Sequence, residues 1–123
     1  MGEHLFGHGR LSYTQIPASD VRESAAFYAS VFGWQVRGGS DSHLSFNDAT
    51  SDMIGAWVTG RAPSREPGVL PYIYVHGIDG IVERIKAHGG EIVKSPYAEG
   101  DLWVATFRDP AGNVIGVWQQ GPC

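Results

Sequence analysis

An internal duplication limits the folds open to this chain more than any other feature of its sequence. Three pairs of segments align in order along the chain: residues 13–20 with 72–79, 46–48 with 107–109, and 52–57 with 113–118. The first pair shares Tyr and Asp at its two ends, and the last pair shares Ile, Gly and Trp. Two copies of a unit form a pseudo-symmetric pair rather than a solenoid. We therefore expect two similar halves, neither of which closes a core alone.

Each half shows the signals of one helix after its first strand. Asp20 followed by Glu23 resembles a capping box, and apolar residues then recur at helical spacing until Gly33 supplies a stop. In the second half a helix is expected between Asp79 and the glycine pair at 89–90. The halves therefore share a strand–helix start.

The remaining segments of each half are typical of strands. Those predicted are 11–16, 34–37, 43–47 and 53–59 in the first half and 72–76, 91–95, 102–108 and 114–119 in the second. The expected fold class is α+β, with two βαβββ repeats forming a curved mixed sheet around a cleft. A flexible N-terminal arm at 1–9 would precede a single domain at 10–121, with repeat one at about 10–59, a connector at 60–70 and repeat two at about 71–120.

Composition excludes several function classes. The chain has 123 residues, which suits one domain. Its net charge of -4, with scattered basic residues, leaves no electrostatic footprint for nucleic acid or an anionic membrane. Its single cysteine, Cys123, forms no internal disulfide, and no apolar run reaches the length of a spanning helix or a secretion segment. A cytoplasmic location is the expectation.

Alternation along the strands predicts which residues face away from the helices, on what we call the open face of the sheet. Trp57 and Trp118 are placed there, next to Gly55 and Gly116, in the same order in each half. So much aromatic area requires a cover, and two half-sheets that close on each other or on a second subunit would form a cleft lined by these groups. The predicted ligand-binding residues are Tyr13, Gln15, His43, Ser45, Trp57, Tyr72, Tyr74, Thr106 and Trp118.

The order βαβββ twice, the run Phe-Tyr…Val-Phe-Gly-Trp at 27–34 and the run Asp-Pro-Ala-Gly-Asn at 109–113 resemble the vicinal oxygen chelate superfamily. This group includes glyoxalase I, bleomycin-resistance proteins, fosfomycin-resistance enzymes and extradiol dioxygenases. The resemblance covers about residues 11–120. It implies a fold and does not imply one activity, because the superfamily hosts many chemistries on one scaffold.

The resemblance also identifies four places where metal-dependent members hold a divalent ion with His, Gln or Glu. Carried over by motif, these places are Tyr13, Gly55, Tyr72 and Gly116. None is a usual ligand, since divalent ions prefer imidazole or carboxylate groups and glycine has no side chain. No metal or other cofactor is therefore expected at the standard site.

A displaced divalent metal remains an alternative, with His43, His76 and Gln15 as its ligands. His4 and His8 also have the spacing of a metal clamp, but their glycine-rich surroundings favour a disordered arm.

Candidate catalytic groups are the side chains on the open face that can transfer a proton. They are Tyr13, Tyr72, His43 and His76, each of which could instead be a core filler or a solvated surface residue. Glu99 and Asp101 flank Gly100 and are interpreted as a solvated hairpin turn.

Three functions remain open from the sequence. The first is a protein that binds a small aromatic or cationic molecule in an aromatic cleft, like the bleomycin-resistance branch, without the standard metal. The second is a lyase, isomerase or epimerase of the glyoxalase type, with Tyr or His acid–base groups or a displaced metal. The third is an interaction module with a filled cleft. The resemblance implies a homodimer, and the expected partner is a small-molecule ligand.

Overall fold

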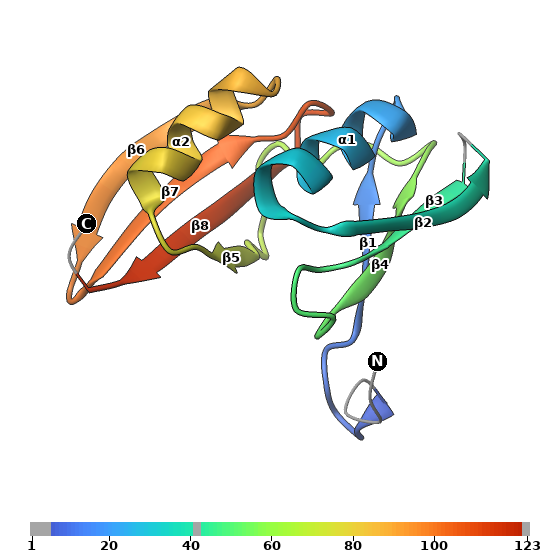
Figure 1. The fold of residues 1–123 in the computed structure, drawn as a ribbon, viewed down its shortest axis with the longest axis horizontal. Coiled ribbons are helices and arrows are strands. Elements are labelled where there is room, and N and C mark those ends of the chain that lie inside the picture. The colour runs from blue at the N-terminus through green and yellow to red at the C-terminus, as the bar shows by residue number, and fades with distance from the viewer. Residues whose placement is uncertain (1–5, 41–42, 122–123) are drawn as a thin grey trace. The chain divides into compact units, whose positions relative to one another are not determined.

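The computed structural model describes residues 6–40 and 43–121 and divides the chain into two units, Met1–Pro63 and Ser64–Cys123. The boundary falls inside the predicted connector. Each unit has one helix and one four-stranded sheet within the described ranges (Figure 1). The α+β class and the repeated βαβββ order are confirmed. Each repeat forms its own four-stranded mixed sheet.

Unit one follows the predicted order, with the ends of its strands displaced by one to three residues. Its sheet has the strand order β1-β4-β3-β2, with β1 parallel to β4 and the other pairs antiparallel. Helix α1 lies on one face of this sheet. Its elements are β1 (Tyr13–Pro17), α1 (Val21–Phe32), β2 (Gln35–Ser40), β3 (His43–Asn47) and β4 (Ile54–Val58).

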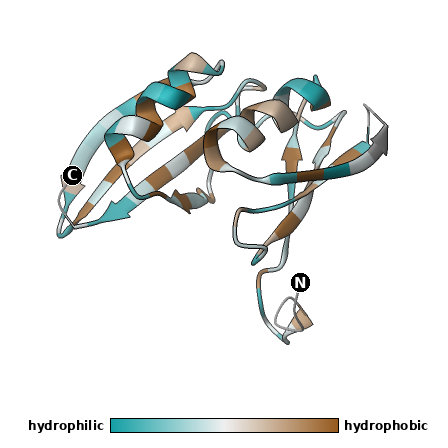
Figure 2. Ribbon diagram, viewed as in Figure 1, coloured by the Kyte–Doolittle hydropathy of each residue, from teal (hydrophilic) through white to brown (hydrophobic). Residues whose placement is uncertain are grey.

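Unit two repeats this plan with the strand order β5-β8-β7-β6. Strand β6 continues beyond its predicted end and through Pro96, which an edge strand tolerates because its outer N–H groups need no ladder partner. Its elements are β5 (Tyr72–Tyr74), α2 (Ile78–Ala87), β6 (Glu91–Glu99), β7 (Leu102–Arg108) and β8 (Val114–Gln120). In Figure 2, hydrophobic segments alternate with paler ones along β8, as expected for a strand whose successive side chains point to opposite faces.

The two helices begin in different ways. Asp20 caps α1 as predicted, because its side chain accepts a hydrogen bond from the Glu23 backbone N–H at 3.1 Å. The prediction that Asp79 precedes α2 is wrong, since this helix begins at Ile78. The backbone N–H of Ile78 donates to Oε1 of Gln119 at 2.8 Å, so a side chain from β8 takes the place of a local cap.

Unit one has an aromatic core beneath α1. Trp34 stacks on Tyr28 and on Phe46, with ring centroids 4.5 Å apart in both pairs. Trp57 completes the cluster, with its ring centroid 4.8 Å from that of Phe46 and 6.1 Å from that of Tyr28. These contacts bury the Trp57 side chain to 2% exposure. Large flat side chains therefore fill the space between helix and sheet.

The predicted face of Trp57 and Gly55 is thus wrong, and the hydrogen bonds show why. The carbonyl oxygen of Trp118 accepts from Val75 N at 2.9 Å, and the carbonyl oxygen of Val58 accepts from Ala18 N at 2.8 Å. In both bonds the donor lies two residues before the helix N-cap. The counterpart of Trp118 is therefore Val58. The internal alignment was one residue out of register at β4, and a slip of one residue moves every side chain to the opposite face.

Candidate functional site

The corrected register places equivalent residues in a row across the open face of each sheet. In unit two Tyr72, Gly116, Thr106 and Lys94 lie side by side on four neighbouring strands. The matching row in unit one is Gln15, Ala56, Ser45 and Arg37. Both rows contain a small residue, then a hydroxyl group, then a cation. They differ at the first strand, where an amide in unit one takes the place of a phenol in unit two.

Tyr72 lies directly over Gly116. A Cβ atom placed on Gly116 would overlap the ring carbons of Tyr72, so the absence of a side chain lets the ring rest against the β8 backbone. Tyr72 retains 42% exposure, which leaves part of the ring accessible. The phenol therefore occupies the space that a longer side chain at Gly116 would take.

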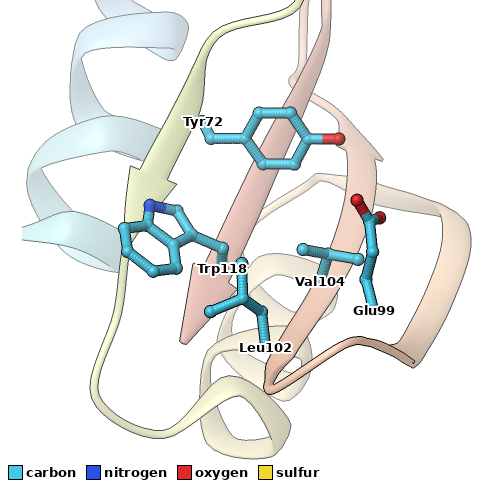
Figure 3. Close-up of a pocket in the computed structure, with 5 residues that line it drawn as sticks. All are labelled: Tyr72, Glu99, Leu102, Val104 and Trp118. Carbon is cyan, nitrogen blue, oxygen red and sulfur yellow. The ribbon is translucent and has the colours of Figure 1, made fainter. Parts of the chain in front are cut away.

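Beside Tyr72, the open face of unit two is hollowed into a pocket of about 310 Å³. Figure 3 shows its lining from four strands: Tyr72 from β5, Glu99 from β6, Leu102 and Val104 from β7, and Trp118 from β8. Val104 is buried at 5% exposure. The volume is at the lower end of the range for small-molecule sites, and the mixture of apolar walls with a few polar groups is typical of them.

Neighbouring aromatic rings hold the Trp118 wall in place. The ring of Tyr74 meets that of Trp118 edge to face, with centroids 4.7 Å apart. The ring of His76 also meets that of Tyr74 edge to face, with centroids 5.3 Å apart. Such contacts favour one orientation of the indole. Tyr74 and His76 therefore support the pocket rather than line it.

The polar side of the pocket lies along β6. The Tyr97 hydroxyl donates to Oε2 of Glu99 at 3.4 Å, and the Lys94 ammonium lies 4.0 Å from the centroid of the Tyr97 ring. Burial raises the pKa of Tyr72, and the nearby Tyr97 and Glu99 raise it further. The Tyr72 phenol is therefore protonated at neutral pH, so it can donate a hydrogen bond to a ligand and is poorly suited to act as a base.

Because the pKa of Tyr72 is raised in the folded protein, the free energy of unfolding should decrease at alkaline pH. Above the ordinary pKa of 10.0, the unfolded chain loses a proton that the folded chain still holds. The contribution of Tyr72 to stability is therefore fully present below pH 10.0 and is lost as the pH rises through the folded-state pKa. Urea denaturation between about pH 9 and about pH 11 should show a smaller loss of stability in Tyr72→Phe than in the wild type. Equal losses would contradict the raised pKa.

The predicted site residues separate into three groups. Tyr72 and Trp118 line the pocket, while Tyr74 and Thr106 lie on the same face without lining it. Trp57 is in the core of unit one and offers no surface to a ligand. The others lie on the open face of unit one: Tyr13, Gln15, His43 and Ser45. The structure therefore brings together two of the nine predicted ligand-binding residues in the pocket.

Three pocket residues were missed from the sequence. Leu102 and Val104 alternate with residues of the helix-covered face, so the period of β7 was the signal that could have identified them. The interpretation of Glu99 as part of a solvated turn is corrected. The turn consists of Gly100 and Asp101, whereas Glu99 is the last residue of β6 and lines the pocket.

The residues at the four places implied by the resemblance form no usual set of metal ligands. By register the counterpart of Tyr72 is Gln15 rather than Tyr13, and the counterpart of Gly116 is Ala56 rather than Gly55. Oε1 of Gln15 accepts from the Arg61 guanidinium at 2.7 Å, which places a positive charge beside the only usual metal-binding atom of the set.

Other candidate metal ligands also lack support from their surroundings. No group of three His, Cys, Asp or Glu side chains that could hold a metal occurs within residues 6–40 and 43–121. His8 is exposed, and its predicted partner His4 lies outside the described residues. The displaced site at His43, His76 and Gln15 stays a prediction.

No described helix is both long enough and apolar enough to span a membrane.

Comparison with known proteins identifies the class that this fold and pocket define. Residues 10–117 match the model of the Glyoxalase/Bleomycin resistance protein/Dioxygenase superfamily, and the chain belongs to this family. It is similar to the putative glyoxylase CFP32 of Mycobacterium bovis, with 25% identity over 93% of this chain and 47% of that protein. It is also similar to the anthracycline biosynthesis protein DnrV of Streptomyces peucetius, with 27% identity over 94% of this chain and 49% of that protein. The chain therefore spans about half the length of these curated relatives.

Among solved structures, TnmS3, an antibiotic binding protein from Streptomyces sp. CB03234, shares the fold with a TM-score of 0.70. The two chains are 23% identical, and the match covers 92% of this chain and 97% of TnmS3. At this identity the likeness supports the fold alone.

Proposed function

We propose that this protein binds a small aromatic or cationic molecule in the pocket of unit two, without a metal at the usual positions of the superfamily. The observation that carries the proposal is the composition of the pocket. Trp118, Leu102 and Val104 provide apolar surface, while Tyr72 and Glu99 provide a donor and a carboxylate. A planar guest would gain stacking and dispersion contacts with the indole, and its polar groups would meet the two oxygen-bearing side chains.

The relatives are consistent with this proposal. TnmS3 is described as an antibiotic binding protein, and DnrV as a protein of anthracycline biosynthesis. We infer from these names that planar natural products are suitable first compounds for a binding screen.

A glyoxalase-type lyase, isomerase or epimerase is the second candidate, favoured by the similarity to CFP32. In such an enzyme Tyr72 would act as a proton or hydrogen-bond donor, because its raised pKa keeps the phenol protonated. Elemental analysis of protein purified without a histidine tag separates the two candidates in part. A stoichiometric divalent metal would contradict the metal-free proposal, and turnover in a substrate screen would favour the enzyme.

We also infer a homodimer. Three tyrosines of the open faces, Tyr13, Tyr72 and Tyr74, are 54%, 42% and 45% exposed, and a second subunit would cover part of this area. Light scattering after size-exclusion chromatography tests the inference, and a monomeric mass at high concentration would contradict it.

Replacing Trp118 with alanine tests the binding proposal. Loss of the indole wall should weaken binding of a planar compound by about 1–2 kcal/mol, or roughly 5- to 30-fold in Kd, measured by calorimetry. Trp103→Phe is the matched control, because Trp103 alternates with Leu102 and Val104 on β7 and faces away from the pocket. Unchanged affinity of every identified ligand for Trp118→Ala would contradict the proposal.

A further inference from the structure

The pocket of unit two contains a single formal charge, the carboxylate of Glu99. Its other lining residues, Tyr72, Leu102, Val104 and Trp118, are uncharged at neutral pH. Within the described part of the chain no Lys or Arg side chain forms an ion pair with Glu99, whose carboxylate accepts a hydrogen bond from the Tyr97 hydroxyl. The carboxylate therefore gives the pocket a negative charge without an internal counterion.

Lys94 is the basic residue on the same face of β6, and its ammonium group contacts an aromatic ring. Lys94 places its ammonium 4.0 Å from the centroid of the Tyr97 ring, in the geometry of a cation–π contact. The Tyr97 hydroxyl in turn donates to Glu99. Tyr97 thus contacts both the lysine and the carboxylate, and no ion pair joins Lys94 to Glu99 among the described residues. Glu99 remains available to a positive charge brought by a ligand.

We infer that Glu99 makes the pocket selective for aromatic amines in their ammonium form over uncharged molecules of the same shape. The inference rests on the proposed function and specifies the charge of the ligand. The aromatic part of the ligand would lie against Trp118 and over Val104, and its ammonium group would meet Glu99 at the rim. Tyr97 is a positioning residue for the carboxylate.

Asp101 provides an internal control for this inference. It lies in the same hairpin as Glu99, carries the same charge and is exposed, but it does not line the pocket. General attraction between an acidic hairpin and a cation would involve both residues. Selection inside the pocket requires Glu99 alone.

Calorimetric titration with naphthylmethylammonium and with the uncharged naphthylmethanol tests the inference. The two probes share one ring system and differ in charge. We expect the wild type to bind the ammonium about five- to tenfold more tightly, the range expected for a charge-assisted hydrogen bond at a partly exposed site. Glu99→Gln should bring the two affinities within about twofold, mainly by weakening the binding of the ammonium probe. Asp101→Asn should keep the preference of the wild type.

The other possible results of these titrations would contradict different parts of the inference. Equal binding of both probes by the wild type would overturn the charge selection and leave the proposed function in place. Loss of both probes in Glu99→Gln would show a structural role for Glu99 and overturn the inference. An equal effect of Asp101→Asn would show attraction by the hairpin as a whole, which also overturns it. Failure of every planar probe to bind the wild type, or binding unaffected by Trp118→Ala, would overturn the proposed function as well.

Discussion

Replacing Gly55 with alanine should destabilise unit one by about 3 kcal/mol, measured as a decrease in the urea midpoint at constant m value. A Cβ atom at this position would overlap the carbonyl oxygen of Thr14 on the neighbouring strand and the ring of Phe46. Neither group can move freely. Thr14 is held in the parallel β1–β4 ladder, and Phe46 is 1% exposed and stacked on Trp34. The methyl group therefore forces a shift of backbone or core.

The matched control is Gly116→Ala, which inserts the same methyl group at the position that the internal alignment pairs with Gly55. We expect a smaller cost, about 1–2 kcal/mol, because the three atoms nearest to the new Cβ all belong to the side chain of Tyr72, which is 42% exposed and is not held in the core. This variant should instead alter ligand affinity, since Tyr72 lines the pocket. Equal destabilisation by the two substitutions would contradict the difference in environment.

Replacing Asn113 with alanine should also cost about 3 kcal/mol of unfolding free energy. Asn113 is 1% exposed, and its Nδ2 donates to Oδ2 of Asp109 at 2.9 Å. Its Oδ1 accepts from the Ser64 backbone N–H at 2.8 Å. The alanine would remove donors from a buried carboxylate and leave a backbone N–H without its acceptor. Thermal and urea denaturation of the variant measure the loss.

The corresponding turn of unit one provides the control for Asn113. There the backbone N–H of Asp52 donates to Oδ1 of Asp48 at 2.9 Å, a bond that survives Asp52→Ala. Asp52 is exposed, so this substitution should change stability by less than about 0.5 kcal/mol. A small effect of Asn113→Ala, similar to that of Asp52→Ala, would show that the buried network does not stabilise the turn.

Much of the fold could be predicted because its signals are local. The Asp20 cap, the Gly33 stop and the period of the apolar residues between them depend on neighbours along the chain. Helix α2 was less accurately predicted at its start, because the group that satisfies its first N–H, Gln119, is distant in sequence. Tyr72 and Trp118 were found by alternation along β5 and β8, whose faces were correctly assigned.

The errors at the site arose where a side chain could fit either face. In β4 the run Ile-Gly-Ala-Trp-Val has apolar residues at every position, so alternation does not distinguish the two registers. The tertiary structure decides, because the space between α1 and the first sheet is filled by the large ring of Trp57 stacked among aromatic neighbours. In β8 the corresponding space is filled by Val117, and Trp118 remains at the pocket.

The sequence by itself determined the duplication, the α+β class, the superfamily and the presence of an aromatic open face. The duplication, the class and the open face follow from periodicity and local motifs, which neighbouring residues encode. The superfamily follows from the resemblance of the repeated βαβββ order and of two short motifs to that group. The tertiary structure shows that the two halves are no longer equivalent, because Trp57 lies in the core and Trp118 lines a pocket. It also decided that Glu99 belongs to the pocket. These properties depend on register between strands and on the volume beneath each helix, and contacts between residues far apart in the chain determine both.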